Sequence, residues 1–367
     1  MTKDKAYWLA WLQINGLGAI LLQRIHKHFG NMALAWTAPG HEFAAIEGFG
    51  TKLIAKIEQE RSRLDPDKIL REYSRQNSHF WTPTESEYPR LLLEIPSPPP
   101  ILHYRGQVNL DENLGVKKTI AIVGTRYPSE YGKRWTRKIS KVLAEHDFTI
   151  VSGMAAGIDT EAHLACLAAG GRTIAVLGTG VDIIYPASNR QLYQQIQERG
   201  LVLSEYPGSK PPNSANFPPR NRIIAGLCRA AIVMEAPIKS GALITSRFAN
   251  EFGRDVYVLP GALDNQKCLG SLELLNRGAH LILSEAHLLE MLGTIPQLDT
   301  PKSTSSPLPE LEPKLAQIYQ TITTVPISLD AIVQQTKLET VFVLASLSQL
   351  ELMGLITQLP GMQYKIN

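Results

Sequence analysis

Residues 119–129 read TIAIVGTRYPS, and this stretch decides the fold. Residues 119–123 show no alternation of polar and apolar side chains, which predicts a strand buried on both faces. The polar turn Gly124-Thr125-Arg126 follows, and the amphipathic pattern of residues 130–146 then predicts a helix. A buried strand, a short turn and a helix in this order form the first half of a βαβ unit.

The same alternation continues to about residue 259. It predicts an α/β fold with a Rossmann-like, doubly wound parallel sheet. Because ligands of such sheets gather at the carboxyl ends of the strands, we expect the polar, glycine-bearing segments that follow the strands to meet in one crevice. The further strands are predicted at residues 148–151, 173–177, 201–203, 230–234 and 256–259, and the further helices at residues 158–169, 189–199 and 240–252.

The region before the sheet, residues 1–75, has helical periodicity interrupted by two glycine turns, Gly16-Leu17-Gly18 and Gly48-Phe49-Gly50. This pattern predicts a helical domain that resembles paired helix-hairpin-helix units, whose glycines let the amides at a helix N-terminus approach a phosphate. Turns that only join the helices of a small bundle explain the same pattern. Whether this region contacts DNA therefore stays open.

The region after the sheet divides into a linker and a small domain. Residues 294–310 are rich in Pro, Ser and Thr and predict a linker between a Rossmann-like domain at residues 80–292 and a winged-helix domain at residues 311–367. The third helix expected there, residues 339–351, contains two Glu and neither Lys nor Arg. Such a helix is a poor surface for phosphates, which favours a protein-contact or regulatory role. A structural appendage is the alternative.

Composition sets limits but does not indicate a function. The chain has 367 residues and a formal net charge of only +3, so a nucleic-acid partner cannot be inferred from bulk charge. Cys166, Cys228 and Cys268 have neither the spacing of a zinc site nor that of a disulfide framework. The sequence has no secretory signal and no stretch of about 18 apolar residues. We expect a cytoplasmic protein with no metal, no cofactor and no membrane contact.

Two turns at the crevice are predicted to hold anions. In the first, Gly124, Thr125 and Arg126 combine a backbone turn with a guanidinium, which can hold a phosphate through two hydrogen bonds. The second is SGMAAGID, residues 152–159, where Gly153 suits a strand-to-helix turn whose amides point at an anion. The basic residues at 133–141 are typical of a solvated helix face.

A carboxylate and an imidazole lie four residues apart after the second turn, at Asp159 and His163. This spacing is compatible with a metal site or an acid–base pair on one helix face, but the sequence offers no third metal ligand. Capping of the helix by Asp159 is the simpler interpretation. We therefore predict neither a metal site nor catalysis at this position.

The most informative segment is FPPRNRIIAGL, residues 217–227. Arg220 and Arg222 flank Asn221 near the start of a predicted helix, and Phe217 precedes them. Guanidinium groups suit phosphates and an aromatic face suits an unstacked base, so this combination predicts a site for a single nucleic-acid strand.

Structural roles are the alternative for the same side chains. Phe217 can belong to the core, and Arg222 can pair with Glu205 or Glu235 to hold a loop. We expect at least one of the two arginines to be structural.

The segment EAPIKSGALIT, residues 235–245, repeats the order of strand end, glycine turn and helix. Lys239, Ser240 and the amides near Gly241 are predicted to bind another phosphate. Ser240 also suits the N-cap of the following helix, a role that is compatible with phosphate binding.

With these motifs the chain resembles the DNA-processing protein A family (DprA, also called Smf) from about residue 88 to residue 279. The strings that carry the resemblance are VGTR, SGMAAGID, TIAVLGTG, LSEYPG, FPPRNRIIAGL, VMEAPIKSGALIT and VLPGAL. The resemblance implies a dimeric, non-enzymatic protein that binds single-stranded DNA, protects incoming DNA and loads the RecA recombinase in natural transformation and recombination. It also implies that Arg126 binds phosphate and that Phe217 stacks on a base.

The chain departs from the family pattern at three places. Ala156 stands where the family usually has Arg, and Ser214 stands where it can have Lys, with Lys210 as the nearest substitute. The family's usual Gly-Cys-Asn is Gly270-Ser271-Leu272 here. The complete set of predicted DNA-binding residues is Gly124, Thr125, Arg126, Gly153, Lys210, Phe217, Arg220, Asn221, Arg222, Lys239, Ser240 and Gly241.

An enzyme is the main alternative. Nucleotide phosphoribohydrolases of the cytokinin-activating LOG type share a Rossmann-like arrangement, and Asp159, Glu205 and Glu235 are candidates for the carboxylate such an enzyme needs. Their Pro-Gly-Gly-x-Gly-Thr turn is replaced here by SGALIT at residues 240–245. A NAD-dependent dehydrogenase is disfavoured because the glycine spacing of the dinucleotide fingerprint is missing.

Overall fold

The computed structural model describes residues 4–75, 79–294, 312–323, 327–353, 355–359 and 362–366. The chain divides into two compact units, Met1–Thr300 and Pro301–Asn367, and each is described by itself. Apart from its first residue, the predicted linker at 294–310 lies outside the described residues.

A nine-stranded sheet forms the centre of the first unit, in the order β1-β2-β6-β5-β4-β3-β7-β8-β9. The pairs from β6 to β9 are parallel, and β1 and β2 add an antiparallel edge. The strands are β1 (His79–Trp81), β2 (Leu102–Gly106), β3 (Thr119–Val123), β4 (Thr149–Ser152), β5 (Thr173–Val176), β6 (Leu201–Ser204), β7 (Ala230–Val233), β8 (Asp255–Val258) and β9 (His280–Leu281).

The central strands match the prediction because they are buried on both faces. Every residue of β3, β4, β5, β6 and β7 is buried, which is why the sequence shows continuous apolar runs there. The predicted α/β fold with a doubly wound parallel sheet is confirmed. The short strands β1, β2 and β9 are additions that the sequence pattern did not predict.

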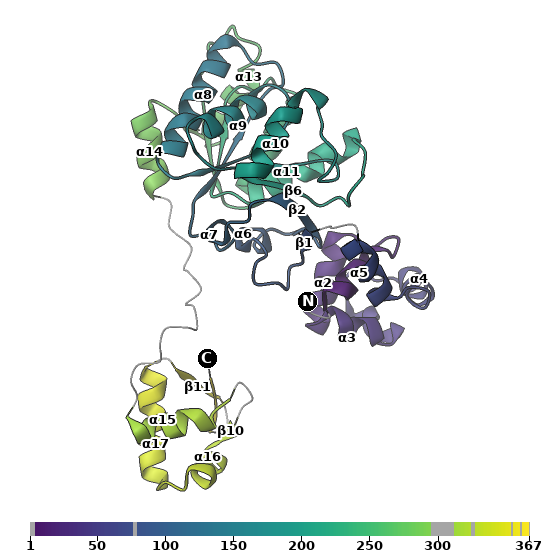
Figure 1. The fold of residues 1–367 in the computed structure, drawn as a ribbon, viewed down its shortest axis with the longest axis vertical. Helices are drawn as coiled ribbons and strands as arrows, with labels where there is room; N and C mark the ends of the chain where they lie inside the picture. Colours follow the sequence, from purple (N-terminus) through teal and green to yellow (C-terminus); the bar gives the residue numbers. More distant parts are fainter. Residues whose placement is uncertain are drawn as a thin grey trace. The chain divides into compact units, whose positions relative to one another are not determined.

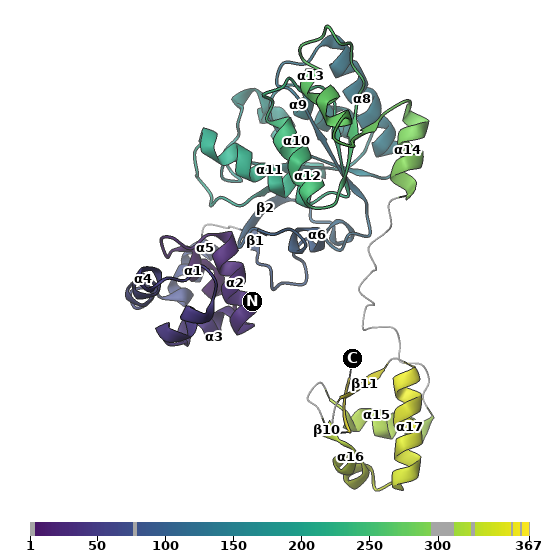
Figure 2. The same ribbon diagram turned by 180° about the vertical axis from the view of Figure 1, so that it is seen from behind.

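Helices cover both faces of this sheet (Figures 1 and 2). Ile139 of α8 and Ile158 of α9 pack on one face, and Ile223 of α11, Ala249 of α12 and Leu274 of α13 pack on the other. The helices are α6 (Arg90–Leu93), α7 (Leu110–Asn113), α8 (Glu130–Glu145), α9 (Ile158–Ala168), η2 (Ala187–Asn189), α10 (Arg190–Arg199), η3 (Ser214–Asn216), α11 (Phe217–Gly226), α12 (Ala242–Glu251), α13 (Leu269–Leu275) and α14 (Glu285–Thr294).

The strand order reverses between β3 and β7. From β3 the chain builds β4, β5 and β6 on one side, and it then returns to add β7, β8 and β9 on the other. At such a switch point the turns that leave the two neighbouring strands diverge to opposite faces and open a crevice. The turns after β3 and β7 carry two of the predicted phosphate-binding segments.

Helices also form the N-terminal region of this unit, whose core is built around Trp11, Ile25 and Phe43. Gly16 and Gly48 adopt positive φ angles of 100° and 92°, and the second glycine of each turn, Gly18 or Gly50, is the N-cap of the next helix. The helices are α1 (Asp4–Leu12), α2 (Ala19–Phe29), α3 (Met32–Thr37), η1 (Gly40–Ala45), α4 (Thr51–Arg61) and α5 (Pro66–Arg75).

The second unit has its own core, which includes Ile318, Ile332, Val343 and Leu347. A three-stranded antiparallel sheet of order β10-β12-β11 accompanies the helices, as in a winged helix; β10 lies between the first two helices, and β11 and β12 follow the third. Residues 360–361 of the predicted terminal hairpin lie outside the described residues. The elements are α15 (Pro313–Thr321), β10 (Ile327–Ser328), α16 (Leu329–Thr336), α17 (Thr340–Leu352), β11 (Ile356–Leu359) and β12 (Gln363–Ile366).

Across the described ranges, no helix combines the length and the apolar character needed to cross a membrane.

Candidate functional site

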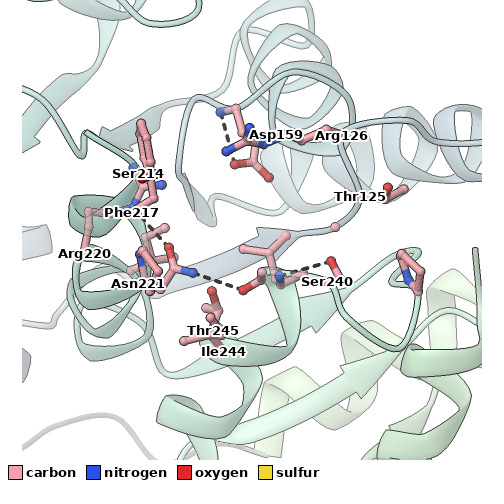
Figure 3. A pocket seen from close by; sticks show the side chains of 18 of the residues that line it. Thr125, Arg126, Asp159, Ser214, Phe217, Arg220, Asn221, Ser240, Ile244 and Thr245 are labelled. Carbon is pink, nitrogen blue, oxygen red and sulfur yellow. Dashed lines mark hydrogen bonds between the residues drawn. The ribbon is translucent and has the colours of Figure 1, made fainter. Parts of the chain in front are cut away.

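A cavity of about 600 Å³ opens at the carboxyl ends of the parallel strands, where the switch point lies. Three segments form most of its lining: the turn after β3, the first turns of α11, and the end of the turn before α12 with the start of that helix (Figure 3). Ala155, Asp159, Tyr185, Pro212 and Ser214 complete it. Of the predicted binding residues, the following line it: Gly124, Thr125, Arg126, Phe217, Arg220, Asn221, Ser240 and Gly241.

Two glycines allow the turn after β3 to pass close to its neighbours. A Cβ atom on Gly124 would lie 2.5 Å from Ile158 Cγ1, and one on Gly157 would lie 2.5 Å from the carbonyl oxygen of Thr125. Gly157 also has a φ of +84°, which favours glycine. The amide of Thr125 donates to the carbonyl of Glu235 (2.7 Å), so the turns after β3 and β7 are bonded together. This packing fixes the position from which Arg126 extends.

Arg126 is exposed, and within the described part of the chain it forms no ion pair. Its guanidinium carbon lies 5.8 Å from the centre of the Phe217 ring, and that of Arg220 lies 5.9 Å from the same centre. The ring of Tyr185 stacks on Phe217 with centroids 5.5 Å apart and planes 30° apart. Two cations and two aromatic rings therefore meet at one wall of the cavity.

Arg220 is held rigidly in the wall of the cavity. It donates to the carbonyls of Gly153 (3.0 Å) and Val176 and to Oδ1 of Asn221 (3.1 Å). Burial lowers the pKa of Arg220 to about 10, and the charge of Asp159 opposes this change. Arg220 therefore stays positively charged at neutral pH.

Asp159 lines the cavity beside Arg220. Its Oδ2 accepts hydrogen bonds from the amides of Gly153 (3.1 Å) and Ala155 (3.2 Å), so it holds the turn that precedes α9. Burial raises the pKa of Asp159 to about 6, and the charge of Arg220 opposes this change. Its protonation state therefore changes close to neutral pH.

His163 is engaged elsewhere. It is completely buried, and its Nδ1 lies 2.6 Å from Oγ1 of Thr173. Burial lowers the pKa of His163 to about 3, so the ring is neutral at neutral pH. The described residues contain no group of three or more His, Cys, Asp or Glu side chains that could hold a metal ion.

The structure does not bring Arg222 into the cavity, although it was predicted to bind DNA. Its Nη1 and Nη2 lie 2.8 and 2.6 Å from the two carboxylate oxygens of Glu205, and its Nε donates to the carbonyl of Ser97 (3.0 Å). Both charged groups are largely buried. The expectation that one arginine is structural is correct, and it applies to Arg222.

Three other predicted residues also lie outside the lining. Gly153 stands behind the wall, where it bonds to Asp159 and Arg220 as described above. Lys239 is exposed beside the lining residue Ser240. Lys210 is exposed on the loop after β6, and its carbonyl accepts from the amide of Gly180 (3.0 Å).

The start of α12 is tied to α11 by Asn221, whose Nδ2 donates to the carbonyl of Gly241 (3.1 Å). The prediction that Ser240 is the N-cap of α12 is wrong, because Gly241 occupies that position. Ser240 lies one residue earlier, and its Oγ accepts from the amide of Ala242 (3.2 Å). These bonds place the hydroxyl of Ser240 and the N-terminus of α12 at the floor of the cavity (Figure 3).

The basic run of α8 does not extend the site. Four of its five cations pair with carboxylates: Lys133 with Glu130, Arg137 with Glu161, Lys138 with Glu285, and Lys141 with Glu145. The fifth, Arg134, lies over the ring of Tyr131. The interpretation of this run as a solvated helix face agrees with the structure.

Tyr185 is one of the lining residues that sequence reasoning missed. It follows β5 by nine residues and is 40% exposed at the cavity. A signal was available, because β5 was expected to end in the same crevice and Tyr185 is the first aromatic residue after it.

Comparison with known proteins identifies two matching families. Residues 79–293 match the family described as DNA recombination-mediator protein A, and residues 302–362 match the DprA winged helix domain. The second match agrees with the predicted winged helix.

Three similar proteins cover between 58% and 99% of this chain. Protein Smf of Synechocystis sp. is 49% identical over 99% of this chain and 98% of its own length. The solved structure of DNA processing protein A from Streptococcus pneumoniae has a TM-score of 0.69 at 36% identity and covers 79% of this chain and 98% of that one. A structure from Helicobacter pylori, described as showing that protein's single-stranded DNA binding mode, has a TM-score of 0.52 at 31% identity and covers 58% of this chain and 95% of that one.

Proposed function

The chain belongs to the DNA recombination-mediator protein A family, also named DprA or Smf, and we propose that its cavity binds single-stranded DNA. The observation that carries this proposal is that the guanidinium groups of Arg126 and Arg220 both lie close to one aromatic ring, at 5.8 and 5.9 Å from the centre of the Phe217 ring. A nucleotide offers a negative phosphate and a flat base close together. Paired cations around an aromatic ring match both parts.

Arg126 has the chief role in binding phosphate. Its guanidinium is exposed and unpaired within the described residues, so it can turn to a phosphate without breaking an ion pair. Arg220 adds a fixed charge in the wall, and the hydroxyl of Ser240 and the amides at the start of α12 add neutral donors. Because these groups recognise the backbone and not the base edges, binding is independent of sequence and falls steeply with salt.

Phe217 and Tyr185 provide the surface for a base. Their stacked rings extend the platform beyond a single side chain, and Tyr185 is exposed enough to accept a further ring. Stacking of this kind tolerates every base because each has an aromatic face. In duplex DNA the bases are paired and stacked on one another, so the platform favours a single strand.

The remaining steps of the proposal follow from family membership. The relatives are named as DNA-processing proteins, and we propose that this chain acts in the cytoplasm without catalysing a reaction, protects incoming single strands and loads the RecA recombinase onto them. A homodimer would place two cavities on one strand and increase the overall affinity. For the winged helix we propose a protein contact, because α17 exposes Val341 and Phe342.

The hydrolase alternative lacks a free carboxylate among its three candidates. Glu205 pairs with Arg222, and Glu235 is completely buried and accepts from the amide and hydroxyl of Ser129 at 2.8 and 2.5 Å. Asp159 faces the cavity but is bonded to two backbone amides. Each carboxylate therefore supports the walls.

The test is fluorescence anisotropy of a labelled oligothymidine and of a matched duplex, each titrated with the full chain at two salt concentrations. Tight binding of the single strand that weakens with salt is expected. Equal affinity for both DNA forms, or no binding, would contradict the proposal, and in the second case a screen of mononucleotides for hydrolysis would follow.

A further inference from the structure

A second, smaller hollow of about 180 Å³ lies at the antiparallel edge of the sheet. We call it the β2 hollow, because Tyr104 and Arg105 of β2 line it, together with His79 of β1. The loops after β5 and β6 complete it with Asp182 and Ser209.

The β2 hollow shares two loops with the main cavity. The loop after β5 gives Asp182 to the hollow and Tyr185 to the cavity, and the loop after β6 gives Ser209 to the hollow and Pro212 to the cavity. The amide of Ser209 donates to Oδ1 of Asp182 (2.7 Å), which ties the two loops together. The two openings therefore lie only a few residues apart along both loops.

A cation without a carboxylate partner distinguishes this hollow. In the part of the chain that the structure describes, the half-buried side chain of Arg105 forms no hydrogen bond and no ion pair, although Asp182 faces the same hollow. The carboxylate of Asp182 accepts from Ser209 instead. A guanidinium that is partly removed from water and lacks a carboxylate partner is suited to an external anion.

Aromatic rings stand beside this cation. The ring of His79 stacks on Tyr104 with centroids 5.6 Å apart and planes 26° apart, and Tyr104 stacks on the buried Trp81 at 4.0 Å. Tyr104 is therefore held in place from behind, and His79 is the exposed end of the stack. The hollow repeats, on a smaller scale, the combination of arginine and stacked rings found in the main cavity.

We propose that the β2 hollow is a second nucleotide subsite for the strand that occupies the main cavity. A phosphate binds Arg105, a base stacks at His79, and the exposed Lys210, next to Ser209 on the shared loop, neutralises the backbone between the two sites. This proposal rests on the proposed function, since it concerns the same strand. It assigns roles to two residues outside the main cavity, Arg105 and Lys210.

The length of the bound DNA strand provides the test. Binding of a labelled oligothymidine of about 4 nucleotides and of one of about 16 nucleotides is measured as a function of salt, because sites on folds that bind single strands span this range. In the full wild-type chain the longer strand is expected to bind more tightly and with a steeper salt dependence. Arg105→Ala is expected to lower the salt slope for the longer strand by about one unit and to leave the shorter strand unchanged.

Matched variants separate charge, stacking and folding. Arg277→Ala removes an exposed arginine paired with Glu273 on α13 and is expected to leave both strands unaffected. Arg105→Lys keeps the charge and is expected to keep the salt slope. His79→Ala is expected to weaken binding of the longer strand with no change in slope.

The outcomes also distinguish the subsite from the proposed function. If the wild-type chain binds neither strand, the proposed function fails, and the subsite fails with it. If it binds the shorter strand but additional length adds neither affinity nor salt dependence, only the subsite is rejected. The subsite is also rejected if Arg105→Ala loses the same affinity for the shorter and the longer oligothymidine while its thermal unfolding midpoint is unchanged. The substitution would then act on the main cavity.

Discussion

Arg222 and Glu205 form a two-pronged ion pair between the loop after β6 and α11, with nitrogen–oxygen distances of 2.8 and 2.6 Å. Their side chains are only 9% and 15% exposed. Two residues earlier on the same helix, Arg220 lines the cavity instead. The two arginines of this motif thus have separate roles: Arg222 stabilises the fold, and Arg220 presents its charge at the cavity.

Replacing Arg222 is expected to affect stability and not the number of phosphate contacts. Arg222→Ala leaves the carboxylate of Glu205 without its partner in a largely buried position, which costs about 3–5 kcal/mol of unfolding free energy. Denaturant unfolding measures this loss. In the fraction that stays folded, the salt slope of DNA binding is expected to equal that of the wild type.

The control is the double variant Arg222→Ala with Glu205→Gln. It removes the unpaired carboxylate charge of Glu205 and is expected to recover part of the lost stability. A lower salt slope in stable Arg222→Ala protein would mean that Arg222 contacts the strand directly.

Arg126→Ala tests the phosphate contact of the main cavity. Its loss is expected to weaken binding alike for every sequence and to lower the salt slope by about one unit, because one phosphate contact is removed. Anisotropy titrations with two unrelated oligonucleotides over a series of salt concentrations measure both effects. The matched control is Arg137→Ala, since Arg137 is an arginine of α8 that pairs with Glu161. An unchanged slope in Arg126→Ala would remove Arg126 from the site.

Phe217→Ala tests stacking. The expected loss is about 1–3 kcal/mol of binding free energy with no change in salt slope, because a ring and no charge is removed. Phe217→Tyr is expected to retain affinity. Tyr185→Ala is expected to show a smaller loss in the same direction, since Tyr185 lies at the outer end of the stack. If Phe217→Ala changes the slope, the ring acts by positioning Arg126 or Arg220.

The central fold could be predicted because burial on both faces leaves a direct trace in the sequence. β3 and its parallel neighbour β7 contain almost only apolar side chains, whereas β1 has three residues and β2 mixes His103 and Arg105 with apolar ones. Strands this short or mixed give no periodic signal, and their pairing depends on partners far along the chain.

The location of the site and the types of side chain that line it could be predicted from the sequence, but the role of each residue could not. The strand ends indicated where charge and aromatic rings would gather, and eight of the predicted residues line the cavity. Because two successive steps along a helix rotate by about 200° around its axis, the side chains of Arg220 and Arg222 lie on nearly opposite faces of α11. Which of them faces inward depends on Glu205, seventeen positions before Arg222, and on the packing of Ser97.

Acidification is expected to strengthen DNA binding, because Asp159 lies in the cavity wall with its pKa raised to about 6. Above this value its carboxylate is ionised and offsets the charge of Arg220, and below it the side chain is neutral. A bound phosphate favours the neutral form further. If the bound phosphate raises the pKa of Asp159 by about one more unit, the free protein and the complex have different pKa values for this group. DNA affinity at a pH below both of these pKa values then exceeds the affinity at a pH above both by about tenfold.

Titration of binding from about pH 8 to about pH 5 measures this effect, with an oligothymidine whose bases do not ionise in that range. Asp159→Asn keeps an oxygen that can accept from the amides of Gly153 and Ala155 but carries no charge. This variant is expected to bind at pH 8 as tightly as the wild type does at pH 5, and to lose the pH dependence of binding.

The same carboxyl group makes the stability of the fold depend on pH. Because the pKa of Asp159 is raised in the folded protein, protonation of Asp159 stabilises the folded state. This stabilisation is complete below the ordinary pKa of 3.8 and is lost as the pH rises through about 6. Asp159→Asn should therefore also melt at a higher temperature than the wild type at pH 8, and a pH dependence that persists in this variant would place the titrating group elsewhere.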